Sequence, residues 1–429
     1  MARDHVTSAA GNARDWTVPL GTKPRGEFER IAWTAGQNLR ALAEGRAQID
    51  YLYVPDVESL AALLRHAGPE TQALRRRMMP RLAYRSRLWQ GVHDRGEAYC
   101  FAACPVETRD LTRMQPHFPA AMVVYSIPKL VLRAGESFDR TSCPEDWDLG
   151  DREEIYVLCN IGQLEIEAGA EIRVNGNVLS LVVQNLGCGG GRISLGPTLT
   201  PVDRGPMGGF DGARGADGLA GADGKAGQSV CVASSVLGPV PRSIPASEDR
   251  DGQSGGDGRP GGAGTRGRPG GMCKSAEILV RDWTDRGGSL EIDARAGDGG
   301  CGGDGGRGGD GGTGGTPGRG HLFLTPPLAD GTPGKGGRGG RGGDGGPAGH
   351  AGLGSHIFVE TPKPNDVHVT ALDGRPGNPG VGGRGGNGGA SGATGPSSAS
   401  GANGRRGRPG RTRPGPNVFV IEAFQGAKT

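Results

Sequence analysis

Glycine occupies every third position through five long stretches of this chain. The stretches that keep this phase are residues 209–227, 252–270, 297–318, 334–352 and 374–410, with one skipped step at Ser398 in the last. A chain that turns once in three residues and carries no side chain at one of them can touch another backbone along that whole face. The phase therefore predicts polyproline-II rods packed backbone to backbone. With 34% hydrophobic residues, one apolar core cannot organise the whole chain.

The third and fourth stretches have glycine at two of their three positions. Two bare faces predict neighbouring rods on two sides, and the remaining face, which holds residues such as Asp304 and Arg338, is expected to be wet. The glycines that we expect to be structural, because a side chain there would separate the rods, are Gly300, Gly303, Gly306, Gly309, Gly337, Gly340, Gly343, Gly383 and Gly386. About 20 residues at about 3.1 Å per residue give rods of about 60 Å.

Other arrangements of the glycine stretches compete with such a bundle. A collagen triple helix needs three chains and frequent Pro, whereas most positions between the glycines here are Gly, Asp or Arg. A disordered linker needs no phase. A further alternative is that each stretch is a loop that folds back on itself from one corner of a solenoid. Nearly equal spans favour about six rods that run alternately out and back, with the fifth stretch turning at 396–400.

Apolar residues recur at a period of two from about residue 120, which predicts strands with tight turns. A corner motif appears as Leu130-Val-Leu-Arg-Ala-Gly135 and again as Leu164-Glu-Ile-Glu-Ala-Gly169. We expect these strands to build a β-solenoid or a sandwich. The later segments that we expect to join the same sheet hold Ile278, Leu290, Phe358, Val367 and Val420.

The residues before 120 carry helical signals, with apolar spacing over 26–92 that predicts two to four helices. The expected fold class is therefore mixed: an N-terminal helical region, a β-rich middle, and a glycine-rich bundle of about six polyproline-II helices with interleaved strands. The expected boundaries are a helical region at 1–119, a β-rich region at 120–204, the bundle at 205–411, and a C-terminal strand at 412–429 that rejoins the β-region.

Gly-Gly-Asp and Gly-Gly-Arg triplets over 205–411 resemble the polyglycine-II bundles of phage tail-fibre tip adhesins, of glycine-rich antifreeze proteins, and of the amino-terminal domain of Obg-type GTPases. The adhesin resemblance implies variable binding loops at the free end of the bundle. A GTPase is excluded because no Gly-x-x-x-x-Gly-Lys-Ser/Thr loop is present. Ice binding is disfavoured because the outward positions are largely Asp, Arg and Lys rather than Thr or small apolar residues.

Two Pro-rich, non-repetitive segments, 237–247 and 324–329, are expected at the free end of the rods. The candidate binding residues in them are Leu237, Pro239, Pro241, Arg242, Leu324, Pro326 and Pro327. These segments can equally be plain turns that join one rod to the next.

No residue pattern predicts catalysis, a metal site or a cofactor. Glu165 and Glu167 share one strand face and are expected to be surface carboxylates, because a glycosidase pair would need a second strand and a cleft. Cys100 and Cys104, with His93 and His117 nearby, have a poor spacing for zinc. We expect reduced thiols and no bound metal.

The sequence thus predicts a non-enzymatic recognition or assembly module that binds a protein or glycan surface, as part of an adhesin, phage-like particle or toxin. The alternative is a structural subunit that self-assembles into an oligomer or a collagen-like fibre, and a β-solenoid carbohydrate-active enzyme ranks third. Nucleic-acid binding is not expected, because net charge is only +3 and the Arg-Gly-Gly units lack interleaved aromatics. No signal peptide or membrane-spanning run is recognised, so a cytoplasmic location is the default, with non-classical export left open.

Overall fold

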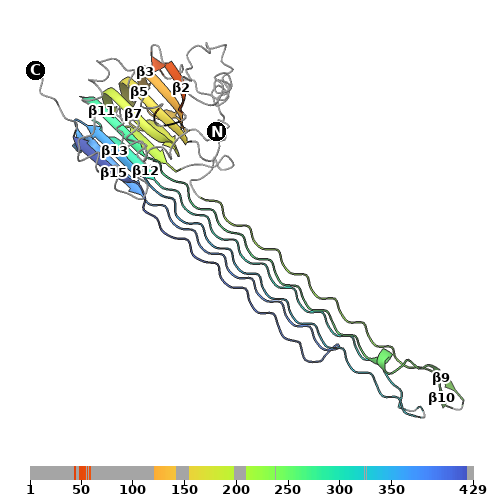
Figure 1. Cartoon of the computed structure of the whole chain (residues 1–429). Helices are drawn as coiled ribbons and strands as arrows, with labels where there is room; N and C mark the ends of the chain where they lie inside the picture. The colour runs from red at the N-terminus through yellow and green to blue at the C-terminus, as the bar shows by residue number, and fades with distance from the viewer. Residues whose placement is uncertain are drawn as a thin grey trace, which may run out of the picture.

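The structure is a computed structural model, and it describes residues 43–44, 48–54, 56, 58, 120–141, 154–197, 209–236, 238–322, 324 and 326–422. Figure 1 shows a body of β-strands at one end and long extended segments that run side by side away from it to a second, small group of strands. No α-helix lies wholly within the described residues. Along the chain, strands of the body alternate with these extended segments, which connect the body to the small group of strands.

Two parallel sheets form the body. The first sheet contains β1 (Ala43–Glu44), β2 (Gln48–Val54), β3 (Ala120–Leu132), β5 (Glu154–Glu167), β7 (Val178–Gly189), β11 (Ala276–Asp285), β13 (His356–Thr361) and β15 (Asn417–Glu422). The second sheet contains β4 (Ser137–Asp139), β6 (Glu171–Asn175), β8 (Arg192–Gly196), β12 (Leu290–Arg295) and β14 (Val367–Leu372). All neighbours pair in parallel, except that β1 and β2 run antiparallel to β3.

From β3 onward the chain alternates between the two sheets, so each pair of strands forms one coil stacked on the coil before it. The alternating apolar residues of both sheets meet in one core, in which Tyr125 of β3 and Phe138 of β4 pack edge to face with ring centroids 6.2 Å apart. The corner motif lies where β3 and β5 end, and its glycines, Gly135 and Gly169, have φ of 81° and 78°. Positive φ explains why glycine closes each of these corners.

Between coils the chain leaves the body and returns in pairs of extended segments, which we call rods 1 to 6. They comprise residues 209–228, 252–271, 297–318, 331–352, 374–390 and 398–411. Rods 1 and 2 lie between β8 and β11, rods 3 and 4 between β12 and β13, and rods 5 and 6 between β14 and β15.

The rods form two layers. Rods 1, 3 and 5 run parallel to one another in one layer and rods 2, 4 and 6 in the other, and the two layers run in opposite directions. Backbone hydrogen bonds repeat every three residues, as where Gly303 N donates to Thr265 O (2.9 Å) and Gly343 N donates to Gly306 O (2.8 Å). Rods 3 and 4 are hydrogen-bonded to four neighbours each, so they form the interior.

A side chain on the inward glycines would collide with backbone. A Cβ at Gly306 would meet the carbonyl oxygen of Ala216, and one at Gly340 would meet that of Arg259, each far inside van der Waals contact. A backbone carbonyl of a neighbouring rod stands in the same way against all nine glycines that the sequence singles out: Gly300, Gly303, Gly306, Gly309, Gly337, Gly340, Gly343, Gly383 and Gly386. The interior of the rods is therefore polar backbone rather than hydrocarbon.

The predicted fold class is wrong. The protein is built on two parallel β-sheets that take strands from residues 43 to 422, instead of a helical region followed by a separate β-rich middle and a polyproline-II bundle. Gln48–Val54, inside the predicted helical region, is a strand, because Ile49, Tyr51 and Tyr53 favour the pleated conformation and pair with β3. The other residues of the predicted helices, apart from Asp56 and Glu58, lie outside the described residues.

The expectation that later segments join the same β-structure is confirmed. Ile278 pairs with Leu181 of β7, and Phe358 pairs with Glu277 of β11. Strand β12 pairs with β8 and with β14, and β15 pairs with β13.

Candidate binding site at the rod tip

The tip, which we define as residues 229–250 and 319–330, lies at the end of the rods farthest from the sheets (Figure 1). Its first part is a hairpin of β9 (Cys231–Ser235) and β10 (Gly238–Ser243), followed by the short 3-10 helix η5 (Glu248–Arg250). The hairpin turns at Gly238, whose φ is 112°, and Ser235 Oγ donates to Gly238 O at 2.7 Å.

The second part of the tip is the loop between rods 3 and 4. A bridge between His321 and Leu328 closes it, and Asp330 Oδ1 accepts a hydrogen bond from Gly320 N at 2.7 Å. The two parts are tied together, because Arg250 Nη1 donates to Ala329 O at 2.6 Å. The tip therefore presents two chain segments in one fixed arrangement.

Large apolar side chains stand in solvent on this tip. Val236 is fully exposed, Leu322 is 73% exposed, and Val240 and Ile244 are 50% and 54% exposed. Arg242 is exposed on the same hairpin. The tip thus exposes four large apolar side chains and the cation of Arg242 to solvent.

The structure places most of the predicted binding residues at this tip. Pro239, Pro241 and Arg242 are exposed on β10, and Pro326 and Pro327 are exposed on the loop. Leu324 is buried at 9% exposure, so it packs within the tip and is poorly placed to meet a partner. Leu237 lies outside the described residues.

Sequence reasoning missed the exposed apolar residues Val236, Val240, Ile244 and Leu322. Nothing in their local pattern separates an exposed valine or leucine from a buried one. The available signal was their position: each lies within a few residues of a proline in a segment that joins two rods.

A regular contact fixes the rods that carry this tip. Within each layer, an Asp-Gly dipeptide of one rod hydrogen-bonds to both backbone groups of one residue in the next rod. The Asp carboxylate accepts a hydrogen bond from the N–H of that residue, and the Gly N–H donates to its carbonyl oxygen. Asp217 and Gly218, for example, hold Arg307 in this way, with both hydrogen bonds at 2.7 Å. The Asp residues that accept such a hydrogen bond from the next rod are Asp211, Asp217, Asp223, Asp251, Asp257, Asp298, Asp304, Asp310 and Asp344.

These hydrogen bonds alter the acidity of some carboxylates. The hydroxyl and backbone N–H of Thr313 lower the pKa of Asp223, and the backbone N–H and hydroxyl of Thr332 lower that of Asp251. The backbone N–H of Arg405 lowers the pKa of Asp344. Asp-Arg ion pairs also occur within single rods, such as Arg307 with Asp310 at 2.8 Å.

His350 occupies the Asp position at the end of rod 4. Arg411 N donates to its Nδ1 at 3.0 Å, and the N–H of the following residue, Ala351, donates to Arg411 O at 3.0 Å. Partial burial lowers the pKa of His350, and so do the nearby cations Arg413, Arg266 and Arg411.

The groups considered for catalysis are engaged in the fold. Glu165 forms ion pairs with Lys129 (3.6 Å) and Arg286 (3.1 Å), and Glu167 Oε2 accepts a hydrogen bond from Ala134 N. Across the described parts of the chain, no group of three His, Cys, Asp or Glu residues could hold a metal ion. Cys100 and Cys104, with His93 and His117, whose spacing is poor for zinc, lie outside those parts.

The described cysteines are free thiols in different surroundings. Cys159, Cys188 and Cys273 are buried, Cys301 is partly buried on rod 3, and Cys231 is exposed at the tip. Burial raises the pKa of the Cys159 and Cys273 thiols to about 12.

Among the described residues, no helix has the length and apolar character needed to cross a membrane. No family model and no curated protein matches the chain. A solved structure of the springtail antifreeze protein from Granisotoma rainieri, described as a bundle of nine polyproline type II helices, is 21% identical over 50% of this chain and 97% of its own. Its TM-score is 0.08, so this likeness carries no argument about fold or function.

Proposed function

We propose that this protein is a non-enzymatic recognition module, whose rods hold the tip away from the sheets so that the tip binds a protein or glycan surface. The observation that carries the proposal is the exposure of Val236, Val240, Ile244 and Leu322 at the far end of the rods. Scattered single apolar side chains on a surface need no explanation, whereas four within one small part of the chain's surface support an interaction site.

The backbone of the tip supports binding at low entropic cost. Pro239 and Pro241 restrict the β10 backbone, and the hydrogen bond from Arg250 to Ala329 joins the two segments. A surface that is already ordered before contact loses less conformational freedom on binding.

The rods support the same proposal, because they fix the tip in space. Each is hydrogen-bonded to at least two others at every third residue, so the arm cannot bend without breaking a row of backbone hydrogen bonds. An apolar tip on a stiff arm can reach a surface that the sheets do not touch.

Binding of the full-length protein to an array of glycans and purified surface proteins tests this proposal. The tip variant combines Val236→Ser, Val240→Ser and Leu322→Ser. The control combines Leu219→Ser and Val381→Ser, which replace side chains that are 65% and 60% exposed on rods 1 and 5. We expect the tip variant to lose at least about tenfold in affinity and the control to bind like the parent. Binding that survives in the tip variant, or no binding by the parent, overturns the proposal.

A structural subunit is the second candidate, and the end of the β-body favours it. Strand β15 ends the first sheet and β14 ends the second, and Val369 and Leu372 are exposed on β14. The edge of a sheet can template pairing with a further chain. Light scattering separates the candidates: a monomer supports recognition at the tip, and an oligomer that dissociates in the Val369→Ser/Leu372→Ser variant supports assembly through this edge.

A further inference from the structure

A group of basic residues lies on the layer of rods 2, 4 and 6 near the sheets. We call it the basic strip, and it consists of Arg266, His350, Arg405, Arg406, Arg408, Arg411 and Arg413. No Asp or Glu occurs in residues 258–271, 345–355 or 398–416, which are the parts of the chain that form this end of the layer. Asp344 of rod 4, which accepts a hydrogen bond from Arg405 N, lies at the outer end of the strip. From there toward the sheets, the positive charge of the strip is not balanced by acids in rods 2, 4 and 6.

Hydrogen bonds place these residues side by side although they are far apart in sequence. Gly267 N donates to Pro347 O at 3.0 Å and Ala348 N donates to Arg408 O at 2.9 Å, which aligns the three rods at one level. One step nearer the sheets, His350 accepts from Arg411 N. Burial is the largest cause of the lowered pKa of His350, and the nearby charges of Arg413, Arg266 and Arg411 lower it further.

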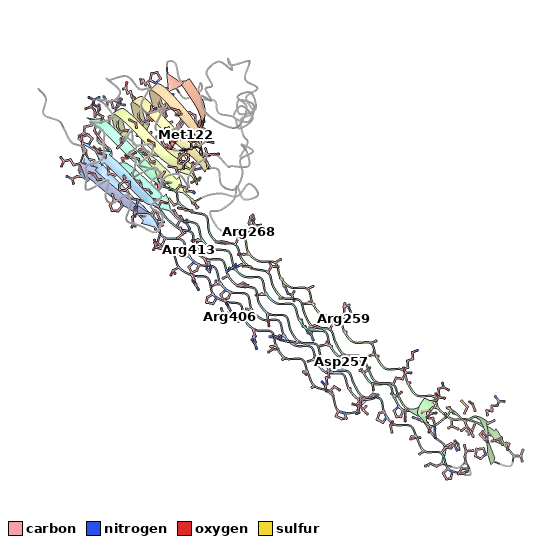
Figure 2. All side chains as sticks on the ribbon, in the orientation of Figure 1. Met122, Asp257, Arg259, Arg268, Arg406 and Arg413 are labelled. Carbon is pink, nitrogen blue, oxygen red and sulfur yellow. The ribbon has the colours of Figure 1, made fainter. Side chains whose placement is uncertain are left out.

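The arginines of the strip are available for an external anion. Arg266, Arg405, Arg406, Arg408 and Arg411 are exposed, and within the described residues none of the strip's arginines forms an ion pair. Other rod arginines are engaged, as Arg341 is with Asp344. In Figure 2, Arg406 and Arg413 project from one side of the rods and Arg259 and Arg268 from the opposite side.

We propose that the basic strip binds a sulfated or carboxylated polysaccharide. Guanidinium groups recur at three-residue steps on a fixed backbone, which matches a linear polymer that carries an anionic group on successive units. Arg is suited to this task because its planar fork binds such oxyanions through two parallel hydrogen bonds.

The strip fits other polyanions less well. Residues 398–416 contain no aromatic side chain, so the stacking platform that single-stranded nucleic acids use is missing. A duplex is a stiff cylinder and meets a flat strip only along one line of phosphates, whereas a polysaccharide can lie along the whole strip. The strip and the tip lie at opposite ends of the rods, so this inference does not depend on the proposed function.

The test measures binding of the full-length protein to heparin, to polygalacturonate and to duplex DNA at several salt concentrations. The strip variant combines Arg408→Gln, Arg411→Gln and Arg413→Gln. The control combines Arg214→Gln, Arg259→Gln and Arg268→Gln, which removes the same number of charges from other faces of the rods. Thermal melts check that both variants fold.

We expect the parent to bind heparin or polygalacturonate, the strip variant to bind at least about tenfold more weakly with a shallower salt dependence, and the control to change less than about threefold. Arg405→Gln with Arg406→Gln should also weaken binding several-fold, which keeps the test decisive if the first variant fails to fold. Equal losses in strip variant and control, or parental affinity in the strip variants, overturn the proposal. Tighter binding of duplex DNA than of either polysaccharide, with the same loss in the strip variants, overturns the polysaccharide assignment.

Discussion

Asp304 Oδ1 lies 2.7 Å from the backbone N of Val381, 77 residues later in the chain, and accepts its hydrogen bond. The next residue, Gly305, donates its own N–H to Val381 O at 2.8 Å. One dipeptide thus satisfies both backbone groups of a residue whose side chain points to solvent and which has no rod beyond it. The repeated Asp-Gly units are therefore the means by which each layer holds its own rods in register.

Removing one of these carboxylates should weaken the contact between two rods locally. We predict that Asp304→Ala lowers the melting temperature by about 2 °C and speeds exchange of the Val381 amide, because an exposed hydrogen bond of this kind stabilises only modestly. Asp304→Asn should lose less, because an amide oxygen can also accept a backbone N–H on the rods, as Asn403 Oδ1 does from Gly385 N. Equal exchange at Val381 in parent and Asp304→Ala would contradict the assigned role.

Side chains inside the rods should be far more damaging. Gly306→Val places its Cβ against the carbonyl of Ala216, and Gly340→Val places its Cβ against that of Arg259. Because the obstacle is backbone and every rod is hydrogen-bonded to others, we predict a loss of more than about 3 kcal/mol in the free energy of unfolding for each variant. Chemical denaturation measures it.

Arg338→Ala is the matched control for these two variants. Arg338 is exposed, and the contact from Asp257 reaches its backbone N, which the substitution keeps. The free energy of unfolding of the control should lie within about 0.5 kcal/mol of that of the parent. A parental melt for Gly306→Val would show that the rods do not pack as described.

Several elements of this architecture could be predicted from the sequence because their physical cause is local. The glycine phase marks where backbones approach, and the structure has a carbonyl of another rod against Gly306 and against Gly340. The corner glycines Gly135 and Gly169 follow a repeated motif that only positive φ explains.

Other elements depend on partners that the sequence does not name. Gln48–Val54 becomes a strand by pairing with β3, about 70 residues away, although its surroundings have helical spacing. The Asp-Gly contact needs a neighbouring rod in register, so the charge pattern alone did not predict it. The exposure of Val236 and Leu322 depends on where the rods end, which no local pattern records.

The histidine at the end of rod 4 should make stability depend on pH. The folded-state pKa of His350 lies below its ordinary value of 6.5, so its contribution is present above about pH 6.5 and is lost as pH falls toward the folded value. A protonated imidazole also cannot accept the hydrogen bond from Arg411 N. We predict a lower melting temperature at pH 5.5 than at pH 7.5.

His350→Asp restores the carboxylate found at the equivalent positions and adds an anion beside Arg266, Arg411 and Arg413. We predict that it melts higher than the parent at pH 5.5 and depends less on pH between 5.5 and 7.5, while His356, whose pKa burial also lowers, keeps its own contribution. Its carboxylate, like that of Asp344, should lose its contribution only at more acidic pH, because the hydrogen bond from Arg405 N holds the pKa of Asp344 below 3.8. An unchanged pH profile in this variant would exclude His350 as the source.

Thiol reactivity should separate the cysteines by burial. Cys231 is exposed, whereas burial raises the pKa of Cys159 and Cys273 to about 12. At pH 8 we expect iodoacetamide to modify Cys231 within minutes, and Cys159 and Cys273 only after unfolding. Peptide mass spectrometry identifies each site. Modification of Cys273 at the rate of Cys231 would contradict the described β-body.

Amide hydrogen exchange along the rods tests whether six hydrogen-bonded rods form one stiff arm that presents the tip. We predict that the amides of Gly303, Gly306 and Gly343, each hydrogen-bonded to another rod, exchange at least about a hundredfold more slowly than in an unfolded chain. They should become labile together when Gly306→Val is introduced. If these glycines exchange at the unprotected rate in the parent protein, the rods are not hydrogen-bonded into one arm.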